Sequence, residues 1–155
     1  MKELKIRKAQ KRDLRTIQNI AKNTIDRCYR SFLGDEGVDW FIYSGESNKE
    51  LETNLDNCDV LLINNSIVAF TIYFKNLIHL MMVDVNFHRI GIGSKLLAHS
   101  ENQLLRQGKS IIRLETFEGN HQAINFYKKN GWCIINKKKD EKYGFVRVYF
   151  EKSLI

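Results

Sequence analysis

The segment from Met81 to Lys95 joins an apolar strand to a helix through a loop that contains two glycines. Apolar residues end the strand, Gly91 and Gly93 stand one residue apart in the loop, and the helical apolar spacing begins at once. Glycines at such a junction let a ligand approach the backbone, and the first turn of a helix offers N–H groups that favour an anion. The segment therefore requires a strand that leads directly into a packed helix, and it predicts a phosphate or pyrophosphate site.

The other apolar patterns predict one mixed α/β domain over residues 1–155. Strands are expected at Leu4–Arg7, Asp59–Ile63, Ile67–Phe74, Leu77–Val85, Ile111–Thr116, Trp132–Ile135 and Phe145–Phe150. Helices are expected from Leu14 toward Tyr29, around Trp40–Tyr43, from Gly91 to Gly108, and between Asn120 and Gly131. The polar segment of residues 44–50 is taken as a connection, and a lysine-rich turn that includes Lys137–Lys139 is expected to join the last two strands.

Several classes of protein are set aside by composition. No apolar run approaches the roughly 18–20 residues of a membrane helix, and the charged N-terminal segment is unlike a signal sequence. Cys28, Cys58 and Cys133 are far apart and form no CxxC pair, which argues against a disulfide framework or a metal site and for a reducing cytoplasm. We therefore expect a cytoplasmic protein without membrane contact.

The formal net charge of +7 invites a nucleic-acid interpretation, but a lysine-rich composition alone could produce it. The distribution of charge is more informative, because residues 34–59 carry eight acidic side chains against Lys49 alone. One acidic segment in a basic chain suggests both an anionic and a cationic partner, although a solvated helix face explains a charge run equally well. Nucleic acid is therefore not the expected partner.

A second group of residues lies on the predicted strand 111–116 and the helix that follows. Asn120 stands where a helix N-cap belongs, and Tyr127 follows seven residues later on the same helical face. Both side chains could face a cleft beside the neighbouring strand. The alternatives are a simple cap for Asn120 and a core aromatic with a hydrated hydroxyl for Tyr127.

Together these segments resemble the GNAT superfamily of acetyl-CoA-dependent N-acetyltransferases, over nearly the whole chain. The family pattern at the phosphate loop is Arg/Gln-x-x-Gly-x-Gly/Ala, which here reads His88-Arg89-Ile90-Gly91-Ile92-Gly93. The sequence departs from the family at His88, in the Arg/Gln position, and at Val85, where many members carry Pro. The resemblance implies a twisted, mostly antiparallel sheet of six to seven strands, flanked by about four helices and splayed in the middle to hold acetyl-CoA.

The resemblance also implies roles for individual residues. The strand edge at Met81, Met82 and Val83 would bind the pantetheine arm, and Asn120 would contact it as well. The pyrophosphate would be held by residues 88–94, which are His88, Arg89, Ile90, Gly91, Ile92, Gly93 and Ser94. Tyr127 would be the general acid that protonates the departing thiolate, and the amine would attack the thioester directly, without an acyl-enzyme.

The base is expected to be a carboxylate, because an alkylamine is mostly protonated near neutral pH and must lose a proton. Glu115 is the first candidate, since its spacing to Asn120 looks like that of ribosomal-protein N-terminal acetyltransferases. Its alternative is an ion pair with Arg113 or another surface base. Asp84 is the rival, because it borders the same cleft, although strand alternation could turn it away.

The acceptor site is expected near the first two helices, with Tyr29, Phe32, Trp40 and Asp84 as contacts. Aromatic side chains there could bind a cation, and the acids Asp35, Glu36 and Asp39 could attract one. Ordinary helix packing explains the same aromatics equally well. The leading hypothesis is acetylation of a cationic small molecule; the alternatives are a protein N-terminus or lysine, a basic nucleic-acid or ribosome-binding module, and a CoA-sensing domain. A homodimer is left open.

Overall fold

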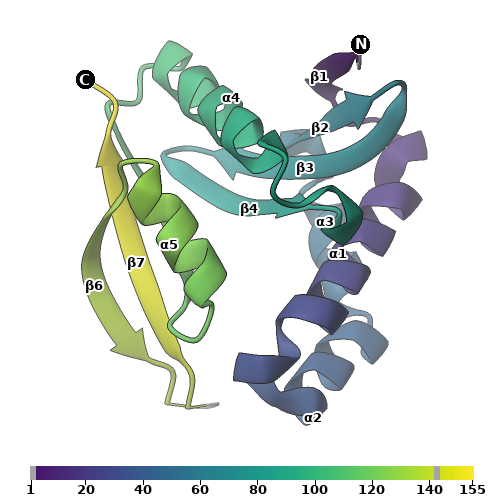
Figure 1. Cartoon of the computed structure of the whole chain (residues 1–155), viewed down its shortest axis with the longest axis vertical. Coiled ribbons are helices and arrows are strands. Elements are labelled where there is room, and N and C mark those ends of the chain that lie inside the picture. The colour runs from purple at the N-terminus through teal and green to yellow at the C-terminus, as the bar shows by residue number, and fades with distance from the viewer. Residues whose placement is uncertain (1–2, 142–143) are drawn as a thin grey trace.

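A computed structural model of the chain describes residues 3–141 and 144–155. Its helices are α1 (Leu14–Cys28), α2 (Arg30–Tyr43), α3 (Glu46–Thr53), α4 (Ile92–Arg106) and α5 (His121–Lys129). Its strands are β1 (Leu4–Lys8), β2 (Cys58–Ile63), β3 (Ser66–Phe74), β4 (Leu77–Val83), β5 (Ile111–Phe117), β6 (Cys133–Lys139) and β7 (Val146–Ser153). Figure 1 shows these elements along the chain. Within the described ranges, no helix is long and apolar enough to cross a membrane.

The strands form a seven-stranded sheet in the order β1-β2-β3-β4-β5-β7-β6. Neighbouring strands run antiparallel except β4 and β5, which are parallel. Their register contains one residue pair, Leu77 with Arg113, at the start of β4. Beyond that pair the two strands diverge, and this opening is the structural origin of the site described below.

The α1 side of the sheet is covered by the helices that precede β2. In α1 the buried residues recur at helical spacing, at Ile17, Ile20, Ala21, Thr24 and Ile25. They pack against Cys58, Val60 and Phe70 of the sheet. Figure 1 shows α4 on the other side of β3 and β4, where Leu96 meets Leu61 and Ala69.

The C-terminal half of the sheet has a core of its own. Leu114 of β5 and Phe150 of β7 pack with Leu97 and Leu104 of α4, and with Tyr127 of α5. This cluster fixes α5 against β5 and β7; Figure 1 shows α5 beside β7. The cluster also includes Ile78 of β4, so β4 and α4 join the two halves of the sheet across the divergence between β4 and β5.

The predicted fold class is confirmed, and so are the order of the strands and the helices after Gly91 and after Asn120. Asn64 and Asn65 have φ values of 49° and 70°, as a tight turn between β2 and β3 requires. Gly34 (φ 79°) has a non-helical backbone and kinks the second helix.

Three expectations about secondary structure are wrong. Residues 44–50 are not only a connection, because Glu46–Thr53 forms α3 through the burial of Ser47 and Leu51. The strand expected to reach Val85 ends at Val83, since Asp84 caps a short 3-10 turn over Val85–Phe87. Lys137–Lys139 pair with β7 as part of β6 instead of forming a turn; residues 142 and 143 of the connection lie outside the described residues.

Candidate active site

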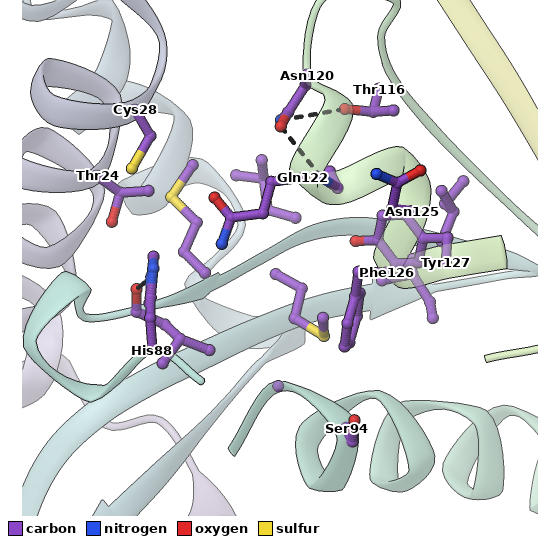
Figure 2. Close-up of a pocket in the computed structure, with 18 of the residues that line it drawn as sticks. Thr24, Cys28, His88, Ser94, Thr116, Asn120, Gln122, Asn125, Phe126 and Tyr127 are labelled. Atoms are coloured by element: carbon purple, nitrogen blue, oxygen red, sulfur yellow. Dashed lines mark hydrogen bonds between the residues drawn. The ribbon is translucent and has the colours of Figure 1, made fainter. Parts of the chain in front are cut away.

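A cavity of about 670 Å³ opens where β4 and β5 diverge. One wall is β4 from Ile78 to Val83, and the facing wall is β5 at Leu114–Thr116 together with α5. The loop after β4 and the first turn of α4 close one end, and the end of α1 lies across another side. Figure 2 shows side chains from α1, α4 and α5 around this space.

The loop before α4 has the backbone of an anion cradle. Arg89 and Gly91 both have left-handed φ values, of 64° and 86°. A glycine suits this conformation, whereas Arg89 adopts it against the usual steric preference of a side-chain-bearing residue. In the first turn of α4, the N–H groups of Ile92, Gly93 and Ser94 have no acceptor within the helix. An anion at this point would gain these donors and the helix dipole together.

Gly93 makes the approach of a ligand possible at the same turn. A Cβ at this position would lie 3.4 Å from the Phe126 ring and 3.9 Å from a Val83 methyl group. The absence of a side chain lets Phe126 and Val83 pack close to the first turn of α4 at the edge of the cavity.

His88, which stands in the Arg/Gln position of the family pattern, binds the strand instead of pointing freely into the loop. Its Nε2 donates to the Val83 carbonyl oxygen at 2.7 Å, a contact drawn in Figure 2. This bond fixes the end of β4 against the loop. His88, Arg89, Gly91, Gly93 and Ser94 line the cavity, whereas Ile90 is exposed and Ile92 is buried in the core with Leu96.

Asn120 caps α5, as predicted, and also lines the cavity. Its Oδ1 accepts a hydrogen bond from the Ala123 N–H at 3.2 Å, and its Nδ2 lies 3.5 Å from Thr116 Oγ1. Figure 2 shows both contacts. The cap orients α5 so that residues one and two turns later, Ala123 and Tyr127, reach the same cavity.

Tyr127 lies at the boundary between the cavity and the second core. Its side chain is only 9% exposed, and its ring contacts Phe126, Trp132 and Phe150. Burial raises the pKa of the Tyr127 hydroxyl above its ordinary value, and nearby Tyr29 adds to the effect. The hydroxyl therefore stays protonated throughout the neutral range, as a proton donor must.

The two carboxylates predicted as bases differ in position. Glu115 lines the cavity, but its side chain is 45% exposed and forms an ion pair with Arg147 at 3.4 Å. Asp84 does not belong to the residues that line the cavity; its Oδ1 accepts a hydrogen bond from the Asn86 N–H at 2.9 Å. The structure thus brings Glu115, but not Asp84, to the cavity.

Of the predicted acceptor contacts, Tyr29 and Phe32 touch each other, with ring centroids 5.1 Å apart, whereas Trp40 and Asp84 do not line the cavity. Tyr29 lines the cavity, and burial raises the pKa of its hydroxyl to about 12. Phe32 instead lies in a separate small hollow beside Phe117 and Gly119, and Trp40 is 56% exposed on α2. Two of the acids of this region, Asp35 and Asp39, share ion pairs with Arg30.

Several lining residues were not identified from the sequence as site residues. Thr24 of α1 is buried, and its Oγ1 has no hydrogen-bond partner among the described residues. Such a hydroxyl at a cavity wall is available to a bound ligand. Cys28 lies beside it, and burial raises the pKa of the Cys28 thiol, which makes the cysteine a poor nucleophile. His79 of β4 and Gln122 of α5 also line the cavity and were not identified from the sequence. A lone polar residue on an apolar strand, such as His79, gives only a weak sequence signal.

The chain belongs to the Acetyltransferase (GNAT) family, whose model matches residues 25–132. Solved structures have the same fold. A GCN5-related N-acetyltransferase from Rhodopseudomonas palustris matches with a TM-score of 0.85 and 14% identity, covering 97% of this chain and 95% of that one. The PaiA N-acetyltransferase from Thermoplasma acidophilum, in complex with coenzyme A, matches with a TM-score of 0.80 and 19% identity, covering 97% and 99%.

A third structure is the ribosomal-protein-S18-alanine N-acetyltransferase from Escherichia coli, with a TM-score of 0.73 and 18% identity over 98% of this chain and 94% of that one. The predicted family is thereby confirmed. The resemblance in fold extends beyond the family match, to the strands at both ends of the chain.

Proposed function

We propose that the protein transfers the acetyl group of acetyl-CoA to a primary amine, most simply the amine of a cationic small molecule. The observation that carries this proposal is that one cavity is lined both by the glycine loop of α4 and by Tyr127 of α5. A phosphate cradle and a buried proton donor in one space suit a phosphate-bearing thioester. Membership of the acetyltransferase family and the coenzyme A complex of the Thermoplasma protein support the same substrate.

The chain's own groups fit acetyl-CoA along the length of the cavity. The first turn of α4 and Arg89 would hold the pyrophosphate through N–H groups and positive charge. Because the pairing of β4 with β5 ends at Leu77, the edge of β4 at Met81–Val83 offers backbone groups that a pantetheine amide could pair with, as an added strand does. Asn120 lines the wall of the cavity that faces this edge.

Acetyl-CoA would supply the thioester carbonyl that the amine attacks. Tyr127 would give its hydroxyl proton to the sulfur, from a hydroxyl that is protonated at neutral pH. A backbone N–H at the end of β4 would polarise the carbonyl oxygen. For the proton of the amine, Glu115 and Asp84 stay predictions from the sequence, and Glu115→Gln and Asp84→Asn variants would test them.

The acceptor side of the cavity favours a small amine. Thr24, Cys28 and Tyr29 of α1 lie across it, and the unpartnered Thr24 hydroxyl can bind a polar group of the acceptor. An alkylamine is a cation before it reacts, so a cationic acceptor requires no further assumption. Acceptance of a peptide amine is the competing outcome.

A panel of four primary amines tests the proposal: spermidine, glucosamine, a hexapeptide with N-terminal alanine, and an N-blocked lysine peptide. Thiol release from acetyl-CoA is measured for each, with mass spectrometry of the product. We expect acetylation of spermidine or glucosamine at a rate that Tyr127→Phe reduces. Preference for a peptide would reassign the acceptor, and release of no thiol with any of the four would contradict the proposal.

A further inference from the structure

We infer that His79 of β4, oriented by Glu50 of α3, is the base that takes the proton of the acceptor amine. This assignment rests on the acetyl transfer proposed above. His79 lines the same cavity as Tyr127, from the opposite wall. Its neighbour Ile78 packs in the apolar cluster that contains Tyr127. The backbone of β4 at His79 therefore passes close to this cluster.

His79 occupies an irregular position in the strand. In the pairing of β3 with β4, Leu80 lies opposite Ile72 and Ile78 lies opposite Tyr73, so His79 is the extra residue of a β-bulge. A bulge breaks the regular alternation of a strand and redirects a side chain, and bulges are frequent beside active sites. The bulge therefore explains how a polar ring leaves an otherwise apolar strand toward the cavity.

The imidazole of His79 is held from two sides. Its Nε2 is hydrogen-bonded to Glu50 Oε1, and the ring centroid of Phe74 lies 5.6 Å from its own. When a carboxylate accepts the Nε2 proton, Nδ1 carries the free electron pair that a base needs. A carboxylate that orients a histidine in this way is a recurring feature of proton-transfer sites. Glu50 is thus a positioning residue.

The remaining candidates for a base in this region are already engaged. Glu115 is paired with Arg147, Asp84 caps the turn after β4, and His88 Nε2 donates to the Val83 carbonyl. His79 is paired with Glu50 through Nε2 alone; its side chain is 30% exposed, and the residue lines the cavity. It is sheltered enough to be held in place and open enough to pass a proton to solvent.

The proton balance of the reaction is complete with these residues. His79 takes one proton from the ammonium group and releases it to solvent. The freed nitrogen electron pair forms the C–N bond at the thioester carbon, and the C–S bond breaks with its electron pair on sulfur. His79 then takes the second N–H proton by the same route. Tyr127 protonates the sulfur and is reprotonated from solvent, so one proton is released per acetyl group transferred.

The kinetic test uses His79→Gln with the amine of the four-member panel that the wild-type protein acetylates. General-base catalysis contributes about 10²–10⁴-fold, so we expect kcat to fall at least about 10²-fold. The KM for acetyl-CoA should change little, because His79 is not part of the phosphate loop. His99→Gln is the matched control: His99 also pairs with a carboxylate, Asp59 at 2.8 Å, but does not line the cavity.

Two variants of Glu50 distinguish a role in orienting the His79 ring from a role in stability alone. Glu50→Ala should lower kcat in the same direction as His79→Gln, whereas Glu50→Gln should restore much of the rate, because its amide oxygen still accepts the Nε2 proton. A loss of thermal stability with unchanged kcat in Glu50→Ala would show a structural role only, and would overturn the positioning assignment.

A second measurement needs neither an acceptor nor a variant. The ¹⁵N shifts of the His79 ring in the full-length protein report which nitrogen carries the proton. In the neutral form of the ring we expect the proton on Nε2, facing Glu50; a neutral ring with its proton on Nδ1 would overturn the assignment. A kcat for His79→Gln within about threefold of wild type would also overturn it, while leaving acetyl transfer established. A wild-type protein that acetylates none of the four amines would overturn the proposed function, and this assignment with it.

Discussion

Tyr127 connects the chemistry of the cavity with the packing of the C-terminal core. Its ring is enclosed by Phe126, Trp132 and Phe150, so the position of the hydroxyl is fixed by contacts that do not involve a ligand. The same enclosure raises the pKa of the hydroxyl through loss of hydration. The packing holds the hydroxyl in place, whereas the raised pKa makes it a weaker acid, so the proposed proton transfer depends on the position of the hydroxyl.

Tyr127→Phe is expected to keep the fold and lose the proton donor. We predict a fall in kcat of about 10²-fold or more, with the KM for acetyl-CoA within a few-fold, because the ring contacts remain. Steady-state thiol release measures both constants. Tyr43→Phe on the exposed end of α2 is the control. An unchanged kcat in Tyr127→Phe would remove Tyr127 from the reaction.

Local elements depend on a few polar contacts, among them the ion pair between Arg7 of β1 and Asp13 at the start of α1. Asp13 is 5% exposed, and its Oδ2 accepts from Arg7 Nη1 and from the Gln10 N–H, both at 2.7 Å. The Arg7 hydrogen bond lowers the pKa of Asp13; burial opposes it, and the Gln10 N–H adds to the lowering. The carboxylate therefore stabilises the fold above its unfolded pKa of about 3.9, and this contribution is lost as pH falls below that value.

We predict that Asp13→Asn lowers the free energy of unfolding by about 1–3 kcal/mol at pH 7, because Arg7 loses a charged partner. The difference from wild type should shrink as the pH falls below about 4. Urea unfolding at pH 7 and pH 3 measures it, with exposed Asp56→Asn as the control. A difference that stayed constant between these pH values would contradict the assignment.

The turn between β5 and α5 is packed directly against α2. A Cβ on Gly119 would overlap the Cβ of Phe32, so α2 approaches the turn only because residue 119 has no side chain. Gly119→Ala should therefore destabilise the protein by about 1–3 kcal/mol through overpacking. At Gly37 an added Cβ would lie 3.9 Å from Phe145 Cζ, so Gly37→Ala should cost little. Thermal unfolding of both variants measures the difference. Equal stability of Gly119→Ala and Gly37→Ala would contradict the close contact between Gly119 and Phe32.

The sequence predicts those elements whose signal is local. The Gly91-Ile92-Gly93 loop and the Asn120 cap are encoded within a few residues, and both lie where they were expected. Helix α3 was missed because its stability comes from Leu51 and Ser47 buried against α1 and α2, not from its polar sequence. The contact between Glu50 and His79 joins residues 29 positions apart, and neither residue type nor spacing reveals it. For the same reason the sequence could not reveal that Phe32 and Trp40 lie away from the cavity, since packing sets their positions; the acceptor site itself stays a prediction.

At the scale of the whole molecule, the sheet consists of two halves joined at one parallel pair. Ile78 of β4 and Leu97 and Leu104 of α4 join the apolar cluster of the C-terminal half, and the cavity opens where β4 and β5 diverge. A ligand in this cavity would contact β4 and α4 on one side and β5 and α5 on the other. Its binding energy would therefore stabilise the arrangement of the two halves as well as the loop it occupies.

Thermal unfolding with and without acetyl-CoA tests the central claim most directly, in wild type, Gly91→Trp and Gly108→Trp. Both glycines have left-handed φ values, of 86° and 88°, with open space around them, at opposite ends of α4. The two variants thus share the backbone strain, but only Gly91→Trp obstructs the loop. At about 100 times its Kd, acetyl-CoA should stabilise by roughly 2.7 kcal/mol, which is several degrees for a domain of this size. We predict this shift in wild type and Gly108→Trp and its loss in Gly91→Trp; no shift in wild type, or an equal shift in Gly91→Trp, would contradict the account.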